Sequence, residues 1–586
     1  MKDKKRGVFY HKNGHIDLVK TFHRDNPSLS KKGKSNITLK INEFSLDPYD
    51  GEWNKKNLRH LLNRALIGVS STELKSFDGM TIDEVIETLF QPEIKIDKPV
   101  NDYFHHFPGD PDAEPGKEWL NSYSDNFAPQ RHESLRNWMF KNQTKRTNSI
   151  HWKLVFFLNN WVVTDLYANG GNANYAYFYY KLLFDSAFGS YKDFIYDITI
   201  NGKMLWYLNL EFSRVDAPDE NYARELQELY TVGKGPNSKF TEGDVVEMSK
   251  ILVGWNSGWG FHTQTGQNTV MFSPHNHDKS DKKLSSFYNN VLIKGREGKD
   301  GEEELKELIN TIFEVDETAF YITRRVYQFF VNPIIDDKIE EFIILPLARR
   351  LRSENYSIVS ILKILLKSKH FYDEQFKFSL IKSPLELYAS MIKEFDFNYT
   401  NFEGKKIDKY EGKPIENFEL ALQKIRIWEI IQRMSKQGMR YLEYPTVSGY
   451  APYYQNPSFD LFWINSFTSN KRAEYAHEFA WDLVLDGGFR LKYSKDIIKW
   501  LESFNAPQDV QRLLEEMIDR LIGFSLLEIQ IDKLKNALLN DGINESYWTN
   551  LWNDRTEHFS ETNQIINHQV NKVLSVIFSM SEFNLF

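Results

Sequence analysis

The stretch DENYARELQELYTVGKGPNSKFTEGDVVEMSKILVGW, residues 219–255, predicts two consecutive helices with clear ends. Pro218 precedes the first turn and Gly233 follows the last apolar residue, which are the usual places of these residue types at the start and end of a helix. Thr241 and Asp244 have the spacing of a capping box, with Asp where Glu or Gln is usual, and predict the start of the second helix. The segment therefore favours a helical fold.

The first of these helices has one charged face and one apolar face, at roughly 100° per residue. The charged face carries Glu220, Asn221, Arg224, Glu225 and Glu228, and the apolar face carries Tyr222, Ala223, Leu226, Leu229 and Tyr230. The charged face has two interpretations. It is either a solvated surface with an i, i+4 ion pair, or a group that faces a polar cleft and binds a cation or a partner. The spacing leaves both open.

The composition is that of a folded protein with a large core, since 15% of its 586 residues are aromatic. The absence of cysteine excludes disulfides and thiolate chemistry, so any metal would need His, Asp or Glu ligands. A net charge of -8 gives no argument for nucleic acid binding.

No apolar run is long enough to span a membrane, because residues 154–163 are few and are interrupted by two asparagines. The positively charged start is followed by no apolar segment, so no secretory signal peptide is expected. The protein is expected to be cytoplasmic, or to be exported with a partner.

The whole chain is expected to be all-α, a large multi-helix body with long irregular loops and little β structure. Residues 1–50 are polar and lysine-rich and predict an N-terminal arm, and residues 51–586 predict a single helical domain. Helical spacing is clear at 302–313, 317–330, 337–351, 358–366, 383–395 and 418–434, and box-like starts occur at Ser70 with Glu73 and at Thr81 with Glu84. Loop insertions are expected at about 101–117, 257–286, 398–414 and 438–465.

Several motifs together resemble the bacterial family catalogued as domain of unknown function 1800. The family pattern N-E-N-Y-A-R-E-L-M-E-L, with T-L-G, Y-T-E-x-D-V and G-W after it, is similar to 219–229, 231–233, 240–245 and 254–255. Further similar segments are 60–65 with Gly68, His277-Asp278 with Lys282, 321–331, 381–384 and 579–583, so that the resemblance covers roughly 53–586. It implies a helical fold, no established reaction, and a protein partner, since the family is frequently paired in genomes with sulfatase-like proteins.

The chain departs from this family at one informative segment. The family's F-W-H-N-H-F corresponds here to residues 157–162, so that both histidines are absent and Asn159 stands at the first of them. Met439 and Tyr444 are further departures, at a glutamine and a proline of the family pattern. If the imidazoles supply metal ligands or acid–base groups in relatives, this chain lacks both groups.

A second group of polar residues lies in MFSPHNHDKSDKK, residues 271–283, which contains His275, His277, Asp278 and Asp281. Two histidines in such a loop either form local hydrogen bonds or bind a metal. The metal candidates are His277, Asp278 and Glu225; with Glu228 they would form an oxygen-rich site suited to calcium, magnesium or manganese. A structural polar core is expected from Asn221, His60, Arg64 and Lys282.

The leading hypothesis is a non-catalytic or weakly catalytic helical accessory protein. Its polar core, formed by Arg224, Glu225, Glu228, His277 and Asp278, would stabilise a binding surface for a protein, with a sulfatase-like partner implied by the resemblance, or for a glycan. The alternative is a metal-assisted hydrolase in which Glu225 or Glu228 acts as the base while His277 and Asp278 hold a divalent cation. A third hypothesis is an anion binder that uses Arg224 and the basic arm. The first two require these groups to meet in one buried pocket.

Overall fold

Helices make up most of the described chain in the computed structural model, which confirms the all-α prediction. The structure describes residues 43–103, 109–120, 127–167, 172–257, 261–262, 267–268, 270–397, 399, 409–410, 413–414, 418–450, 463–481, 483–484, 490–491, 495–539, 543–555 and 561–586. The strands of this part are short antiparallel pairs: β1 (Trp255–Asn256) with β4 (Met271–Phe272), β2 (Phe261–His262) with β3 (Gln267–Asn268), β5 (Lys282–Lys283) with β6 (Leu292–Ile293), β7 (Lys409–Tyr410) with β8 (Lys413–Pro414), and β9 (Leu483–Val484) with β10 (Arg490–Leu491).

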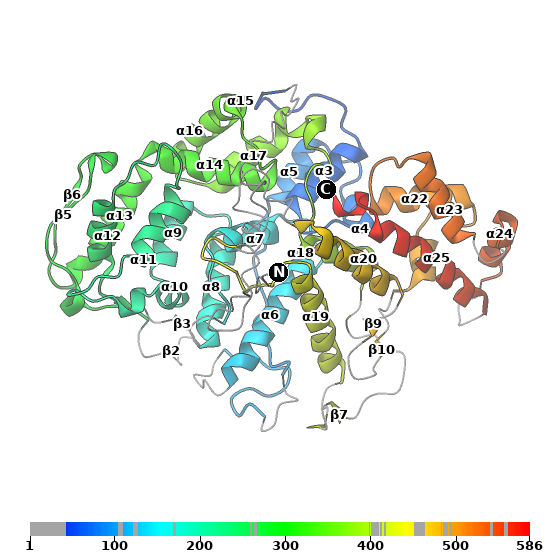
Figure 1. Ribbon diagram of the computed structural model, residues 1–586, viewed down its shortest axis with the longest axis horizontal. Coiled ribbons are helices and arrows are strands. Elements are labelled where there is room, and N and C mark those ends of the chain that lie inside the picture. The colour runs from blue at the N-terminus through cyan, green and yellow to red at the C-terminus, as the bar shows by residue number, and fades with distance from the viewer. Residues whose placement is uncertain are drawn as a thin grey trace, which may run out of the picture.

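The helices are spread along the long axis of the molecule, and the chain runs from the middle to one end, returns to the middle and continues to the other end (Figure 1). One end contains α9 (Tyr191–Thr199), α10 (Gly202–Tyr207), α11 (Asn221–Glu225), α12 (Glu242–Leu252) and α13 (Glu302–Phe313). The middle contains α3 (Lys55–Ala65), α4 (Ser71–Ser76), α5 (Ile82–Leu89), α6 (Ala128–Thr144), α7 (His151–Trp161), α8 (Ala173–Ser186), α14 (Asp316–Phe330), α15 (Asp337–Ile339), α16 (Leu345–Ser353), α17 (Ile358–Lys367), α18 (Pro384–Glu394) and α19 (Phe418–Lys436). The other end contains α20 (Ser466–Ala480), α21 (Ile497–Glu502), α22 (Val510–Leu521), α23 (Glu528–Leu538), α24 (Glu545–Asn553) and α25 (Glu561–Ser579).

Two helices in the middle are buried along their whole length. Every residue of α7 and of α18 is buried. A helix that is surrounded on all sides by other helices needs no polar face, and the sequence LVFFL within α7 has none. The core is therefore centred on these two helices, with the amphipathic helices around them.

The predicted helix starts are present with the expected hydrogen bonds. Thr241 accepts the backbone N–H of Asp244, and the Asp244 carboxylate accepts the backbone N–H of Thr241 at 2.7 Å. Reciprocal boxes also begin α4 and α5 at Ser70 and Thr81. The short aspartate thus completes the box as well as a glutamate would, because each partner satisfies an amide that the first helical turn leaves free.

The two ends of the described chain both lie against the middle of the molecule. Residues 43–49, which belong to the predicted arm, form hydrogen bonds with the end of α17 and the segment after it: Tyr49 N donates to Lys367 O at 2.9 Å, and His370 N donates to Ser45 O at 3.0 Å. The C-terminal residues bond to the segment before α18, where Phe586 N donates to Leu380 O at 2.9 Å. Residues 1–42 of the predicted arm lie outside the described part.

The expected loop insertions contain many of the residues outside the described part, including 104–108, 401–408 and 451–462. The 257–286 segment differs from the expectation, because its described residues include strands and a 3-10 turn (Pro274–Asn276) instead of irregular backbone alone. No helix within the described ranges has both the length and the apolar character needed to cross a membrane.

Candidate functional site

The first helix of the 219–255 stretch changes its winding halfway along. α11 ends at Glu225 and continues as a π-helix, Leu226–Thr231. Most of the apolar face is buried as expected, with Tyr222, Ala223, Leu226 and Tyr230 all fully inaccessible, but Leu229 is only half-buried. Gln227 is also buried, because the wider π turn rotates it inward, and its side chain accepts a hydrogen bond from Tyr288 Oη at 2.8 Å. Turns of this kind occur frequently at functional sites.

Aromatic side chains hold the end of this helix. The Leu229 carbonyl lies in the last turn of the helix, where carbonyl groups have no hydrogen-bond partner within the helix. It accepts hydrogen bonds from Trp161 Nε1 at 2.7 Å and from Tyr321 Oη at 2.8 Å. Gly233 follows at φ 81°, and a Cβ on it would lie 2.4 Å from the Tyr321 ring. Trp161, which occupies the second histidine position of the family segment, thus has a structural role here.

The outward face of the helix is an ion-pair network at the surface. Arg224 donates to both carboxylate oxygens of Glu242, at 2.8 and 2.7 Å, and lies 3.3 Å from Glu220. Glu228 pairs with Lys234 and lies 4.0 Å from Arg224. The hydrogen bonds from Arg224 lower the pKa of Glu242. The guanidinium and its main partner are solvent-accessible, so the geometry favours the solvated-face interpretation for Arg224, whereas the Glu228 side chain is only 13% exposed and is held by Lys234.

Glu225 differs from its neighbours. Its half-buried carboxylate has no hydrogen bond or ion pair with any described residue. Burial raises its pKa, and the nearby charge of Glu228 raises the pKa further. The negative charge of Glu225 contributes to the raised pKa of Tyr207 and of Tyr230. The buried Tyr230 hydroxyl also has no hydrogen-bond partner among the described residues. Of the three catalytic candidates, Glu225 is therefore the one whose carboxylate is available.

His277 lies in a buried ionic cluster with Glu304 and Lys282. Its Nδ1 donates to Val253 O at 2.9 Å, and its Nε2 lies 3.2 Å from Glu304 Oε1. Lys282 Nζ donates to Glu304 Oε2 at 2.6 Å and lies 3.7 Å from Asp278 Oδ1. All three side chains of the cluster are almost completely inaccessible. Burial alone would raise the pKa of Glu304, but the contacts from His277 and Lys282 outweigh it and the pKa is lowered.

Sequence reasoning missed Glu304, the centre of this cluster. It belongs to the acidic first turn of α13, residues 302–304, a pattern that helix N-termini favour for their dipole. Nothing in the sequence distinguishes it from its two exposed or half-buried neighbours. Only the packing of α13 against the 277–283 segment does so.

The expected single pocket does not form, because the two groups lie at opposite ends of α12. Arg224 binds Glu242, the first residue of that helix, whereas His277 binds the carbonyl of Val253, just after its last residue. Eleven residues at 1.5 Å each separate the two contacts by about 16 Å. The requirement that Arg224 and Glu225 meet His277 in one buried site is therefore wrong.

The proposed metal ligands are likewise not brought together. The described ranges hold no group of three or more His, Asp or Glu side chains arranged to bind a metal ion, so His277, Asp278 and Glu225 do not form one. The amine of Lys282 lies between the carboxylates of Asp278 and Glu304, where a cation would need to be. Asp281 pairs with Lys294 at 2.6 Å on the surface.

The residues expected to form a polar core lie in different places. His60 Nε2 lies 3.0 Å from Phe371 O, and Arg64 donates to Phe376 O at 2.7 Å; both residues are buried on α3. Lys282 is buried in the His277 cluster, while Asn221 is half-buried at the start of α11. They do not share one site.

Asn159 is part of a buried hydrogen-bond chain. Its amide donates to Tyr179 Oη at 3.0 Å and its carbonyl accepts the hydroxyl of Tyr444. Two departures from the family pattern thus contact each other. The amide is satisfied on both sides by phenols, so this position is a packed core position in this chain.

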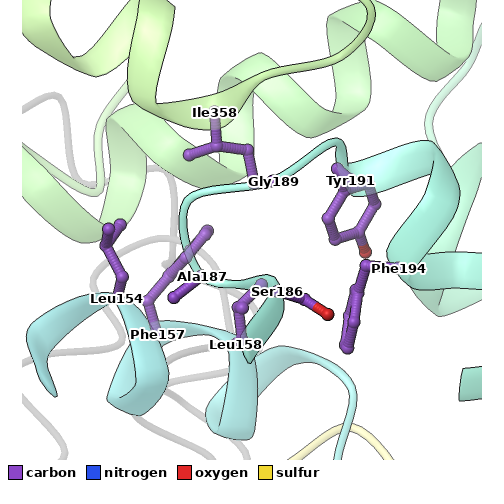
Figure 2. A pocket seen from close by; sticks show the side chains of 9 residues that line it. All are labelled: Leu154, Phe157, Leu158, Ser186, Ala187, Gly189, Tyr191, Phe194 and Ile358. Atoms are coloured by element: carbon purple, nitrogen blue, oxygen red, sulfur yellow. The ribbon is translucent and has the colours of Figure 1, made fainter. Parts of the chain in front are cut away.

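Figure 2 shows an apolar cavity between α7, the segment after α8, α9 and α17. Leu154, Phe157, Phe194 and Ile358 face it, and its free space is about that of one water molecule. The hydroxyl of Tyr191 at its edge donates to Tyr230 O at 2.9 Å. This cavity is a gap in the core and not a substrate site.

Comparison with known proteins gives one match. No curated protein and no solved structure matches the chain. A family model described as "Protein of unknown function (DUF1800)" matches residues 60–585, which is nearly the whole chain. The protein therefore belongs to the DUF1800 family of proteins of unknown function.

Proposed function

We propose that this protein is a non-catalytic or weakly catalytic accessory protein that binds a protein partner at the end of the molecule containing α10 to α13. One observation carries the proposal: of the candidate groups, Arg224, Glu228 and His277 are already engaged within the chain, whereas Glu225 has no hydrogen bond or ion pair with any described residue. Arg224 is bound by Glu242, Glu228 by Lys234, and His277 by Glu304. Groups that are held by such contacts in the folded chain stabilise a surface, and they are poorly placed to act on a substrate.

An exposed apolar patch at the same end of the molecule supports the choice of a protein partner. It consists of Phe212, Val215 and Met271, which are 60%, 42% and 51% exposed. Asn276 links its own segment, which also contains Met271, to the segment of Phe212 and Val215. Its side chain donates a hydrogen bond to Ser213 O at 3.0 Å and accepts a hydrogen bond from Val215 N at 3.2 Å. Apolar groups surrounded by charged side chains are typical of interaction surfaces.

The family resemblance makes a sulfatase-like protein the first partner to test. A glycan is the second choice, with Glu225 and the neighbouring tyrosines as its hydrogen-bonding groups. Any weak acid–base activity would act through Glu225, whose carboxylate has no partner in the described part of the chain and whose pKa is raised, chiefly by burial. The metal-assisted hydrolase finds no support, since its proposed ligands do not come together in the described part of the chain.

Site-specific photo-crosslinking in the native cell tests the proposal. A photoreactive phenylalanine analogue replaces Phe212, and in a matched control it replaces Tyr547, which is 44% exposed on α24 at the other end of the molecule (Figure 1). We expect one discrete crosslinked protein from position 212 and none from position 547.

Two surface variants make the test quantitative. Phe212→Asp should reduce recovery of that partner at least tenfold, whereas Ile529→Asp, at an even more exposed apolar residue on α23, should leave recovery unchanged. Recovery of the protein only as a free monomer, or equal crosslinking from both positions, would contradict the proposal.

A further inference from the structure

A second cavity lies between α3, α18, α22 and the C-terminal residues, far from α10 to α13 (Figure 1). In contrast to the cavity of Figure 2, most of its lining is polar. The polar side chains at its wall are Arg59, Asn63, Lys382, Ser390, Glu394 and Arg520. Its free space is about that of one water molecule.

Lys382 is the unusual residue of this cavity. It is 7% exposed, and its ammonium donates to Phe583 O at 2.8 Å and lies 4.6 Å from the centre of the Phe583 ring. Within the described ranges, no carboxylate is close enough to form an ion pair with it.

Three other buried lysines of the chain have such a partner. The pairs are Lys153 with Glu386, Lys393 with Glu73 at 2.9 Å, and Lys282 with Glu304 at 2.6 Å. A buried ammonium needs a nearby negative charge to offset its desolvation. Lys382 therefore lacks a counter-charge that comparable lysines in this same protein possess.

The charges around Lys382 increase this deficit. Burial lowers its pKa to about 7, and the positive charges of Arg59 and Arg472 lower the pKa further, while the more distant carboxylate of Glu386 partly opposes this decrease. Arg59 donates to the backbone carbonyls of Asp519 and Arg520, so it too has no carboxylate bound to it.

The acidic groups nearby are already satisfied by other residues. The Glu394 carboxylate accepts hydrogen bonds from Ser71 N at 2.6 Å, from Ser71 Oγ at 2.9 Å and from Trp500 Nε1 at 2.9 Å. Glu386 is bound by Lys153. The cavity is thus positively charged, and it contains donors in excess of acceptors.

We propose that this cavity binds one small monovalent inorganic anion of about the size of chloride, with Lys382 as its main ligand and Arg59 as the second positive charge. Such an ion supplies the missing counter-charge, and it favours the charged form of the lysine. A space for one water molecule is too small for phosphate or sulfate, and the buried wall excludes larger organic acids.

Thermal unfolding at constant ionic strength, with gluconate replaced stepwise by chloride, tests binding in solution. A ligand that binds only the folded state raises Tm with the logarithm of its concentration. We expect this rise in the wild type and in Lys377→Met, a control lysine outside the cavity wall that pairs with Glu374. In Lys382→Met the rise should be absent. An equal rise in both variants would overturn the proposal.

A bromide-soaked crystal of the wild-type protein gives a second measurement that does not depend on the stability of a variant. The anomalous signal of bromide distinguishes the anion from water. The expected result is a peak within hydrogen-bond distance of Lys382 Nζ. Bromide peaks confined to exposed side chains, with water alone in the cavity, would refute the site.

Discussion

Removal of the Glu304 carboxylate is the strongest test of the structural role assigned to the His277 cluster. Glu304→Ala leaves the ammonium of Lys282, which is fully inaccessible, without its 2.6 Å partner, and leaves the amide of Arg296 without the acceptor that it has at 2.6 Å. Removing one member of a buried ion pair costs about 3–5 kcal/mol, because the other charge remains buried and uncompensated. We expect a loss of that size in the free energy of unfolding, measured by urea denaturation at pH 7.

The neighbouring Glu303 provides the control. It lies on the same helical turn, pairs with Lys306 at 2.8 Å, and is more than half exposed. Glu303→Ala should therefore cost less than about 1 kcal/mol. In the double variant Lys282→Met with Glu304→Leu, the apolar replacements fill similar volumes without a buried charge and should recover most of the loss.

The same cluster predicts a pH dependence. The pKa of Glu304 is lowered in the folded protein, so its stabilising contribution is fully present above the ordinary glutamate pKa. That contribution is lost as the pH falls through the lowered folded pKa. Wild-type protein should lose this part of its stability in acid, and Glu304→Ala should not. A loss below about 1 kcal/mol for Glu304→Ala, or no recovery in the double variant, would refute the structural role.

Three further predictions concern the 219–255 stretch. Glu225→Gln should stabilise the protein by up to about 1 kcal/mol at pH 7, because the raised pKa of Glu225 means that its ionised form is disfavoured in the folded state. The gain should vanish when urea denaturation is measured at a pH below the ordinary glutamate pKa. Arg224→Ala should reduce stability by less than about 1 kcal/mol, and less still in 1 M salt, because its bond to Glu242 is at the surface. Gly233→Ala should cost about 2 kcal/mol or more, measured by thermal unfolding, from its positive φ and from the contact with the Tyr321 ring.

The local features of the helices could be predicted from the sequence. The 302–313 prediction coincides with α13, and the 383–395 prediction is within one residue of α18 at each end. Capping residues, apolar spacing and glycine after the last turn act over a few residues, so they can be recognised without the rest of the chain. The buried face of the first helix in the 219–255 stretch was predicted for the same reason.

The π turn is the first feature that the sequence did not predict. At 100° per residue Gln227 falls between the two faces, but the wider turn places it in the core against Tyr288. The stabilising bonds to the Leu229 carbonyl come from Trp161 and Tyr321, which are distant in the chain. A local pattern contains no information about such donors.

Most helix ends, the buried helix faces and the family resemblance could be predicted from the amino-acid sequence, because periodicity and capping act within a few turns of one helix. Which charges meet depends on how the helices pack. The tertiary structure placed Arg224 with Glu242 at one end of α12 and His277 with Glu304 at the other, and it left Lys382 without a carboxylate. Ion pairing depends on distances of a few ångströms between side chains of different helices, and those distances are fixed only when the helices pack.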